Sequence, residues 1–137
     1  MKFMLMLMAT QADYEAMGGT PSAGSPAWTE ADRTAMSRFM DSVNNDLQAS
    51  GEFVDGQGLS EPSEARAVTA DKDGLPVLSD DGYGVAEEVL AGYWLLECEG
   101  VGRATEIAAR IQQCPAPEGS VNSPVIVRPV QEAPPVG

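Results

Sequence analysis

The amino-acid sequence predicts an α+β fold in which two helices cover one face of an antiparallel sheet. Apolar residues recur at three- and four-residue spacings in residues 30–49 and 103–112, as they do in amphipathic helices. Between and around these stretches lie short apolar runs that have the composition of strands. These runs are residues 2–9, 52–59, 92–99 and 124–130.

A β-hairpin is predicted in the middle of the chain. Residues 65–70 and 75–78 flank the sequence DKDG, whose Asp-Gly end is typical of a tight turn. We expect residues 1–130 to form a single domain and residues 131–137 to be a flexible tail.

The first helix has clear start and stop signals. Thr29 is placed as its N-cap, and Asp32 three residues later resembles the partner in a capping box. A stripe of five apolar residues predicts a face packed in the core: Met36, Phe39, Met40, Val43 and Leu47. Before this helix, residues 10–27 are rich in Gly, Ser and Pro and predict a long loop.

The order strand, helix, strand, hairpin, strand, helix, strand favours a ferredoxin-like arrangement. Side chains alternate between the faces of a sheet, and both alternating sets are apolar in residues 3–8 and nearly so in residues 93–98. Two helices cover one face only, so we expect a second copy of the chain to cover the other face. The alternative is that residues 10–27 or the hairpin fold over this face within one chain.

The charge excludes several classes of partner. The chain has 8 Lys and Arg against 21 Asp and Glu, which gives a formal net charge of −13. Such a surface repels phosphate backbones and anionic lipid heads, so we expect neither nucleic-acid nor membrane binding. The sequence has no histidine, which removes Ser-His and Cys-His pairs and the commonest zinc ligand. We expect no metal site and no cofactor.

The cysteines and the N-terminus indicate a cytoplasmic protein. Cys98 and Cys114 lack the spacing of a redox or metal motif and are expected to be reduced thiols, with a disulfide as the alternative. The apolar run at the N-terminus is too short for a transmembrane helix and lacks a signal-peptide cleavage site.

Several segments, in their order and spacing, resemble the YCII-related proteins, in particular the branch named for its Asp-Gly-Pro-Phe motif. They are the opening MKFMLML, then SGEFVDGQGL, LSDDGY, EEVLAGYWLLE and the ending AARIQQCP…VIVRPV. The resemblance implies a ferredoxin-like fold whose sheets pair into a dimeric α+β barrel. It also implies a possible regulatory link to extracytoplasmic-function sigma factors.

The family motif is degenerate in this chain. It reads Asp80-Asp81-Gly82-Tyr83, and the acidic pair that follows is Glu87 and Glu88. An enzymatic role suspected for the wider family depends on an Asp-His pair, and this chain has no histidine to supply it. The resemblance therefore supports the fold and the dimer more than it supports an activity.

Five residues are the predicted ligand-binding site: Asp80, Tyr83, Glu88, Glu97 and Arg128. Asp80 follows a strand and could face a cleft, although an Asp in such a position commonly caps a turn. Glu97 and Arg128 belong to the second face of the sheet, where they could pair with each other, or Arg128 could bind a ligand carboxylate or phosphate. A cation site formed by the acids around residue 80 is the weaker alternative, because the spacing of a calcium loop is missing.

Three functions are consistent with these features. The first is a cytoplasmic homodimer that binds a small ligand near the dimer interface. The second is an enzyme acting on a small organic acid, with Asp80 as its candidate base and Arg128 as an anion clamp. The third is a regulatory protein whose acidic surface docks a basic partner such as a sigma factor.

Overall fold

The computed structural model describes residues 1–79, 82–83 and 88–132. Most of the predicted tail, residues 133–137, lies outside the described residues. The elements of the described chain, in order, are β1 (Lys2–Ala9), α1 (Gln11–Met17), α2 (Glu30–Ser50), β2 (Phe53–Gly58), the 3-10 turn η1 (Pro62–Glu64), β3 (Ala67–Ala70), β4 (Pro76–Ser79), β5 (Val89–Glu97), α3 (Val101–Gln112) and β6 (Ile126–Pro129).

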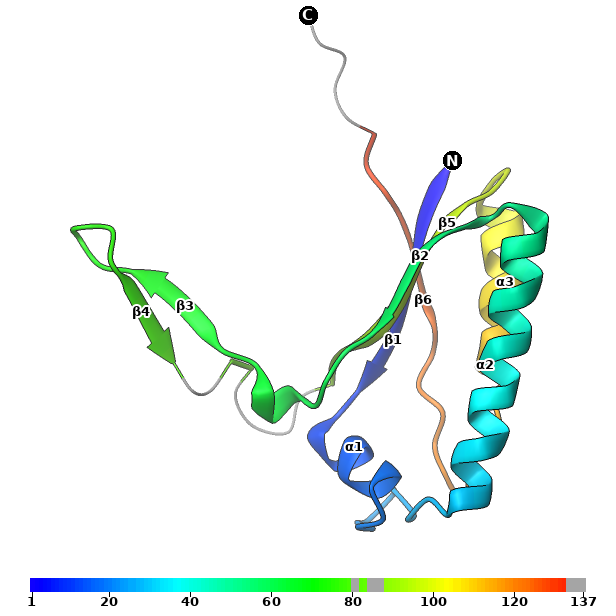
Figure 1. The fold of residues 1–137 in the computed structure, drawn as a ribbon, viewed down its shortest axis with the longest axis horizontal. Coiled ribbons are helices and arrows are strands. Elements are labelled where there is room, and N and C mark those ends of the chain that lie inside the picture. The colour runs from blue at the N-terminus through cyan, green and yellow to red at the C-terminus, as the bar shows by residue number, and fades with distance from the viewer. Residues whose placement is uncertain (80–81, 84–87, 133–137) are drawn as a thin grey trace, which may run out of the picture.

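The predicted α+β architecture is confirmed. Strands β2, β5, β1 and β6 form, in that spatial order, a four-stranded sheet in which every neighbouring pair is antiparallel. Helices α2 and α3 lie together on one face of this sheet (Figure 1). The predicted hairpin forms a separate two-stranded sheet from β3 and β4.

The core lies between the sheet and these two helices. Phe3 and Leu5 of β1 and Leu96 of β5 are fully buried against Val43 of α2 and Ile111 of α3. The alternation of apolar residues in the strands produces this layer, because every second side chain points to the helices. Burying a side chain of this size stabilises the fold by about 1.5–3 kcal/mol before the entropy cost of ordering it.

The sequence signals predicted the start of α2 correctly but missed the short helix α1. Thr29 accepts a hydrogen bond from the backbone of Asp32, whose side chain accepts one from the backbone of Thr29, so the predicted capping box is confirmed. The prediction of an unbroken loop at 10–27 is wrong, because Thr10 and Asp13 form a second capping box that starts α1. This short helix ends where Gly18 and Gly19 follow.

The strand boundaries differ from their predicted positions by up to three residues, and the largest difference is in β5. β5 begins at Val89, three residues before the predicted start, and Cys98 lies just beyond its end, buried as a free thiol. The pairing of β2 with β5 shifts by one residue between Phe53 and Asp55, so β2 contains a bulge near its beginning.

The second face of the sheet is apolar and is not covered by any helix or strand of the described chain. Met4, Met6 and Leu95 are half-buried there, and Ile126 is 41% exposed. Neither segment that could have folded over this face does so. Residues around α1 lie toward α2, and the hairpin extends away from the sheet (Figure 1). The strand pattern therefore correctly predicted an apolar face that one chain leaves open.

An ion pair joins helix α3 to the residue that precedes β2. The guanidinium of Arg103 on α3 donates two hydrogen bonds of 2.9 Å to the carboxylate of Glu52, which precedes β2. These bonds, chiefly, hold the pKa of Glu52 below its usual value. A carboxyl group with a lowered folded-state pKa stabilises the fold above its unfolded pKa and loses this contribution as the pH falls.

We therefore expect a Glu52→Gln variant to lose part of the pH dependence of stability. The free energy of unfolding of the parent protein should fall as the pH drops below about 4.5, the ordinary pKa of glutamate. In Glu52→Gln this fall should be smaller, as measured by urea unfolding across that pH range. A Glu99→Gln control, at an exposed residue outside this ion pair, should keep the parent dependence. Equal pH dependence in both variants would contradict this assignment.

Candidate functional site

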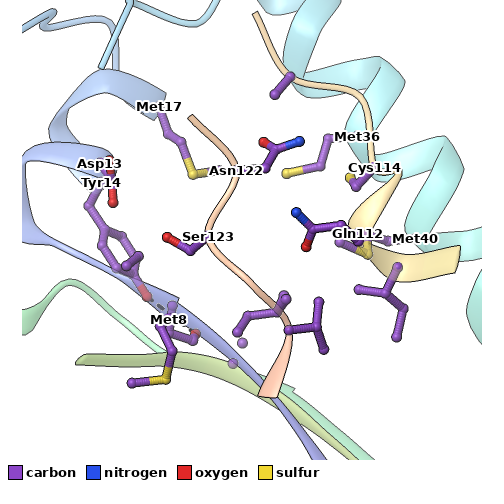
Figure 2. Close-up of a pocket in the computed structure, with 18 of the residues that line it drawn as sticks. Met8, Asp13, Tyr14, Met17, Met36, Met40, Gln112, Cys114, Asn122 and Ser123 are labelled. Atoms are coloured by element: carbon purple, nitrogen blue, oxygen red, sulfur yellow. Dashed lines mark hydrogen bonds between the residues drawn. The ribbon is translucent and has the colours of Figure 1, made fainter. Parts of the chain in front are cut away.

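A cavity of about 550 Å³ lies between the sheet and the helices. Its walls come from β1, β2 and β5, from α1 and residues 24–28, from residues 36–44 of α2, and from the end of α3 and the chain that follows it. Figure 2 shows side chains of α1 on one side, side chains of α2 and the end of α3 on the other, and Asn122 and Ser123 on the segment between them. The volume lies within the range of pockets that bind small molecules, about 300–1,000 Å³.

Methionine is the characteristic residue of the lining. Four of the seven methionines of the chain reach the cavity: Met8, Met17, Met36 and Met40. Two tryptophans, Trp28 and Trp94, add aromatic surface. Methionine side chains are unbranched and polarisable, and they adapt to ligands of different shape. The lining therefore favours apolar ligands without a rigidly defined outline.

The predicted apolar stripe of α2 is divided between two roles. Val43 and Leu47, in the second half of the helix, are buried in the core as predicted. Met36 and Met40, in the first half, are only half-buried because they face the cavity. A similar change occurs in β1, where the pairing shifts between Leu7 and Met8 and both residues line the cavity. The strict alternation predicted for residues 2–9 ends at this bulge.

The polar groups of the cavity are almost all neutral. The amide side chains of Gln112 and Asn122 line it, and within the described chain neither forms a hydrogen bond with another residue. The side-chain oxygen of Asn44 is occupied, since it accepts a hydrogen bond of 2.7 Å from the indole nitrogen of Trp94. Two amides thus offer both donors and acceptors to a ligand.

Asp13 is the one acidic or basic residue among the described lining residues. One carboxylate oxygen accepts the backbone N–H of Thr10 at 2.9 Å, and the other accepts the hydroxyl of Ser25 at 2.9 Å. This carboxylate caps α1 and anchors the following loop. Its oxygens are therefore engaged in structure and are poorly placed to act as a base.

Tyr14 fixes α1 against the sheet. Its hydroxyl donates to the carbonyl oxygens of Leu59, just after β2, and Ala91 of β5, at 2.9 and 3.2 Å. Burial, and to a lesser extent the nearby phenol of Tyr83, raises the pKa of the Tyr14 hydroxyl. The group stays protonated at neutral pH and keeps donating to the sheet.

Cys114 is the thiol nearest to the ligand space. It follows α3, is half-buried and free, and lines the cavity. Burial raises its pKa, which disfavours the thiolate that a nucleophilic cysteine needs. In the part of the chain that the structure describes, no three carboxylate or cysteine side chains come together as a metal site would require. The described lining therefore presents mainly apolar side chains and neutral polar groups.

The predicted site residues do not converge on this cavity. Asp80, with its neighbour Asp81, and also Glu87, lie outside the described residues. Glu97 and Arg128 occupy the second face of the sheet, as their alternation predicted. Glu97 pairs at 2.8 Å with the amino group of Met1, whereas Arg128 is exposed and has no ion-pair partner within the described chain.

Tyr83 and Glu88 lie close to the cavity without lining it. Tyr83 is 48% exposed and influences Tyr14, as described above. Glu88 accepts a hydrogen bond of 2.8 Å from the hydroxyl of Ser123, which is a lining residue. Of these two predicted residues, Glu88 therefore contacts the wall of the cavity.

One sequence signal could have predicted α1, the wall of the cavity that the sequence analysis missed. Thr10 and Asp13 have the same spacing as Thr29 and Asp32, and the same rule would have placed α1. No local pattern marks Gln112 or Asn122, because their approach to α1 depends on the path of residues 113–125 across the fold.

Comparison with known proteins gives no assignment. No family model matches the sequence, and no curated protein is significantly similar to it. None of the described helices is long and apolar enough to cross a membrane.

Removing the Tyr14 hydroxyl should loosen the wall that α1 forms. We expect Tyr14→Phe to lower the free energy of unfolding by about 1–2 kcal/mol, because the carbonyl oxygen of Leu59 loses this donor and that of Ala91 keeps only the backbone N–H of Leu59. Hydrogen exchange should speed up at the backbone amides of residues 11–17 more than in β1. Unchanged stability together with unchanged exchange in α1 would show that the hydroxyl does not hold this helix.

Proposed function

We propose that the protein binds a small, mainly apolar and uncharged molecule in the cavity between the sheet and the helices. The observation that carries this proposal is a volume of about 550 Å³ lined by methionines, tryptophans and neutral amides. Concave pockets of this size, lined mainly by apolar side chains with a few neutral polar groups, are the usual form of a small-molecule binding site.

The charge of the lining selects the kind of ligand. A carboxylate or phosphate would find neither lysine nor arginine among the described lining residues, so its desolvation would go uncompensated. A cation would find only Asp13, whose oxygens are already engaged. A neutral carbonyl, hydroxyl or amide group suits Gln112 and Asn122, and an apolar body suits the methionines.

Binding is better supported than catalysis. The alternative of an enzyme acting on an organic acid rested on Asp80 as base and Arg128 as anion clamp. Arg128 lies on the opposite face of the sheet from the cavity. The cavity itself offers an engaged carboxylate, a neutral phenol and a thiol of raised pKa.

A charge placed in the lining should abolish binding. Nile red, a neutral apolar dye, should bind the parent protein with a blue-shifted emission, and a Met40→Glu variant should bind it at least tenfold more weakly. The introduced carboxylate would either stay ionised in an apolar space or draw water into it. Fluorescence titration gives the dissociation constant.

Ser37→Glu provides the matched control, because Ser37 is exposed on the outer side of the same helix. This variant should bind Nile red as the parent does. Circular dichroism checks that both variants are folded. Parent-like binding by folded Met40→Glu would contradict the proposed site, as would an absence of dye binding by the parent protein.

We also propose that the protein is a homodimer with a ferredoxin-like fold, and a divergent relative of the YCII-related proteins. The sheet order β2-β5-β1-β6 and the two helices on one face support the fold. The open apolar face formed by Met4, Met6 and Leu95 supports the dimer. Exposed apolar patches of this kind are typical of protein interfaces.

A charge at the centre of this face should separate the copies. Light scattering at micromolar concentration should give about twice the 14.4 kDa of one chain for the parent and the single-chain mass for Leu95→Lys. Ala109→Lys, at an exposed site near the C-terminal end of α3, should remain dimeric. A monomeric parent protein would refute the dimer while leaving the cavity proposal intact.

A further inference from the structure

The β3–β4 hairpin carries apolar side chains that nothing in the described chain covers. Val68 is opposite Leu78, and Ala70 is opposite Pro76, so these four residues share one face of the hairpin. Val68 and Leu78 are 60% and 66% exposed. Within the described chain, β3 and β4 pack substantially only on each other. A two-stranded hairpin of this kind is marginally stable alone in water.

The hairpin is nevertheless well formed at both of its ends. At the tip, the carboxylate of Asp71 accepts the backbone N–H groups of Asp73 and Leu75 at 2.8 and 2.9 Å. At the base, Gly82 approaches Ala65 so closely that a Cβ on residue 82 would lie 2.8 Å from that of Ala65. The glycine of the DDGY motif thus lets the chain close on itself at this point.

The hairpin extends on the same side of the sheet as the open apolar face. Figure 1 shows it extending on the side of the sheet opposite α2 and α3. The half-buried residues Met4, Met6 and Leu95 face this same side. A second copy seated on the sheet would therefore lie beside the hairpin of the first.

The sheet face alone is small for a stable dimer. Four strands about 4.8 Å apart and about 20 Å long present roughly 400 Å² of flat area. Stable interfaces bury about 800 Å² on each partner. A hairpin of two four-residue strands adds about 130 Å², and under two-fold symmetry each copy both contributes one hairpin and receives one. The two surfaces together approach the size that a stable dimer needs.

The charges also favour a second copy as the occupant. On the sheet face, Lys2 and Arg128 accompany Asp55 and Glu97, so positive and negative side chains are balanced there. The whole chain carries a net charge of −13, and two copies would repel each other over most other surfaces. Two copies can approach each other at this face, because its positive and negative side chains are equal in number and most of the rest of it is apolar.

We propose that the β3–β4 hairpin is an arm that reaches across the dimer interface and packs the face formed by Val68 and Leu78 on the second copy of the chain. This inference rests on the proposed homodimer and adds to it the segment that encloses the partner.

The test compares two valines of equal exposure. Val68 in the hairpin and Val101 at the start of α3 are both 60% exposed. Sedimentation equilibrium should give a dimer dissociation constant at least tenfold higher for Val68→Asp than for the parent protein. Val101→Asp should leave it unchanged, since an acidic residue is well tolerated at a helix N-terminus. Circular dichroism and Nile red titration should be the same for all three proteins.

Hydrogen exchange of the parent protein provides a second measurement that needs no variant. Backbone amides of residues 67–79 should exchange more slowly as the protein concentration rises through the dissociation constant. A dimer that Val68→Asp leaves intact, with hairpin exchange independent of concentration, would overturn the arm and keep the dimer. A parent protein that is monomeric throughout would overturn both.

Discussion

The fold depends on an antiparallel sheet whose central strands are apolar on both faces. β1 and β5 lie side by side in the middle of the sheet, and their alternating side chains supply Phe3 and Leu96 to one face and Met4 and Leu95 to the other. An antiparallel sheet with one wet face needs polar residues on that face. Helices α2 and α3 cover one apolar face of the sheet. The other apolar face, which they leave open, is the basis of both the proposed dimer and its arm.

The cavity follows from a mismatch between the helices and the sheet. α2 has 21 residues and is about 32 Å long, whereas the eight residues of β1 extend about 26 Å. The beginning of α2 therefore passes the end of β1 and lies beside α1 (Figure 1). Short segments that converge from distant parts of the chain close this end, and they leave a space that Met36 and Met40 line. The cavity and the proposed interface thus lie on opposite faces of the same sheet.

The sequence predicted those features that depend on interactions between residues close together in the chain. The Thr29–Asp32 cap, the DKDG turn and the two-faced strands could be predicted because each depends on neighbouring residues or on strict alternation. The cavity could not, since Gln112 and Asn122 face Tyr14 only through the path of the chain in space. Alternation placed Glu97 and Arg128 correctly on the second face, but the ligand space lies on the first. The same cap signal was present at Thr10, although the glycines and prolines that follow it favoured a loop.

The rate of methionine oxidation tests most directly whether a second copy covers the open face. Dilute hydrogen peroxide oxidises accessible thioethers, and peptide mass spectrometry follows each site separately. Met4 and Met6 should be oxidised several-fold more slowly at high protein concentration than at low concentration, whereas Met36, which faces the cavity, should react at one rate throughout. Rates at Met4 and Met6 that match the rate of exposed Met1 at every protein concentration would contradict the account, because the apolar face would then be open to solvent throughout.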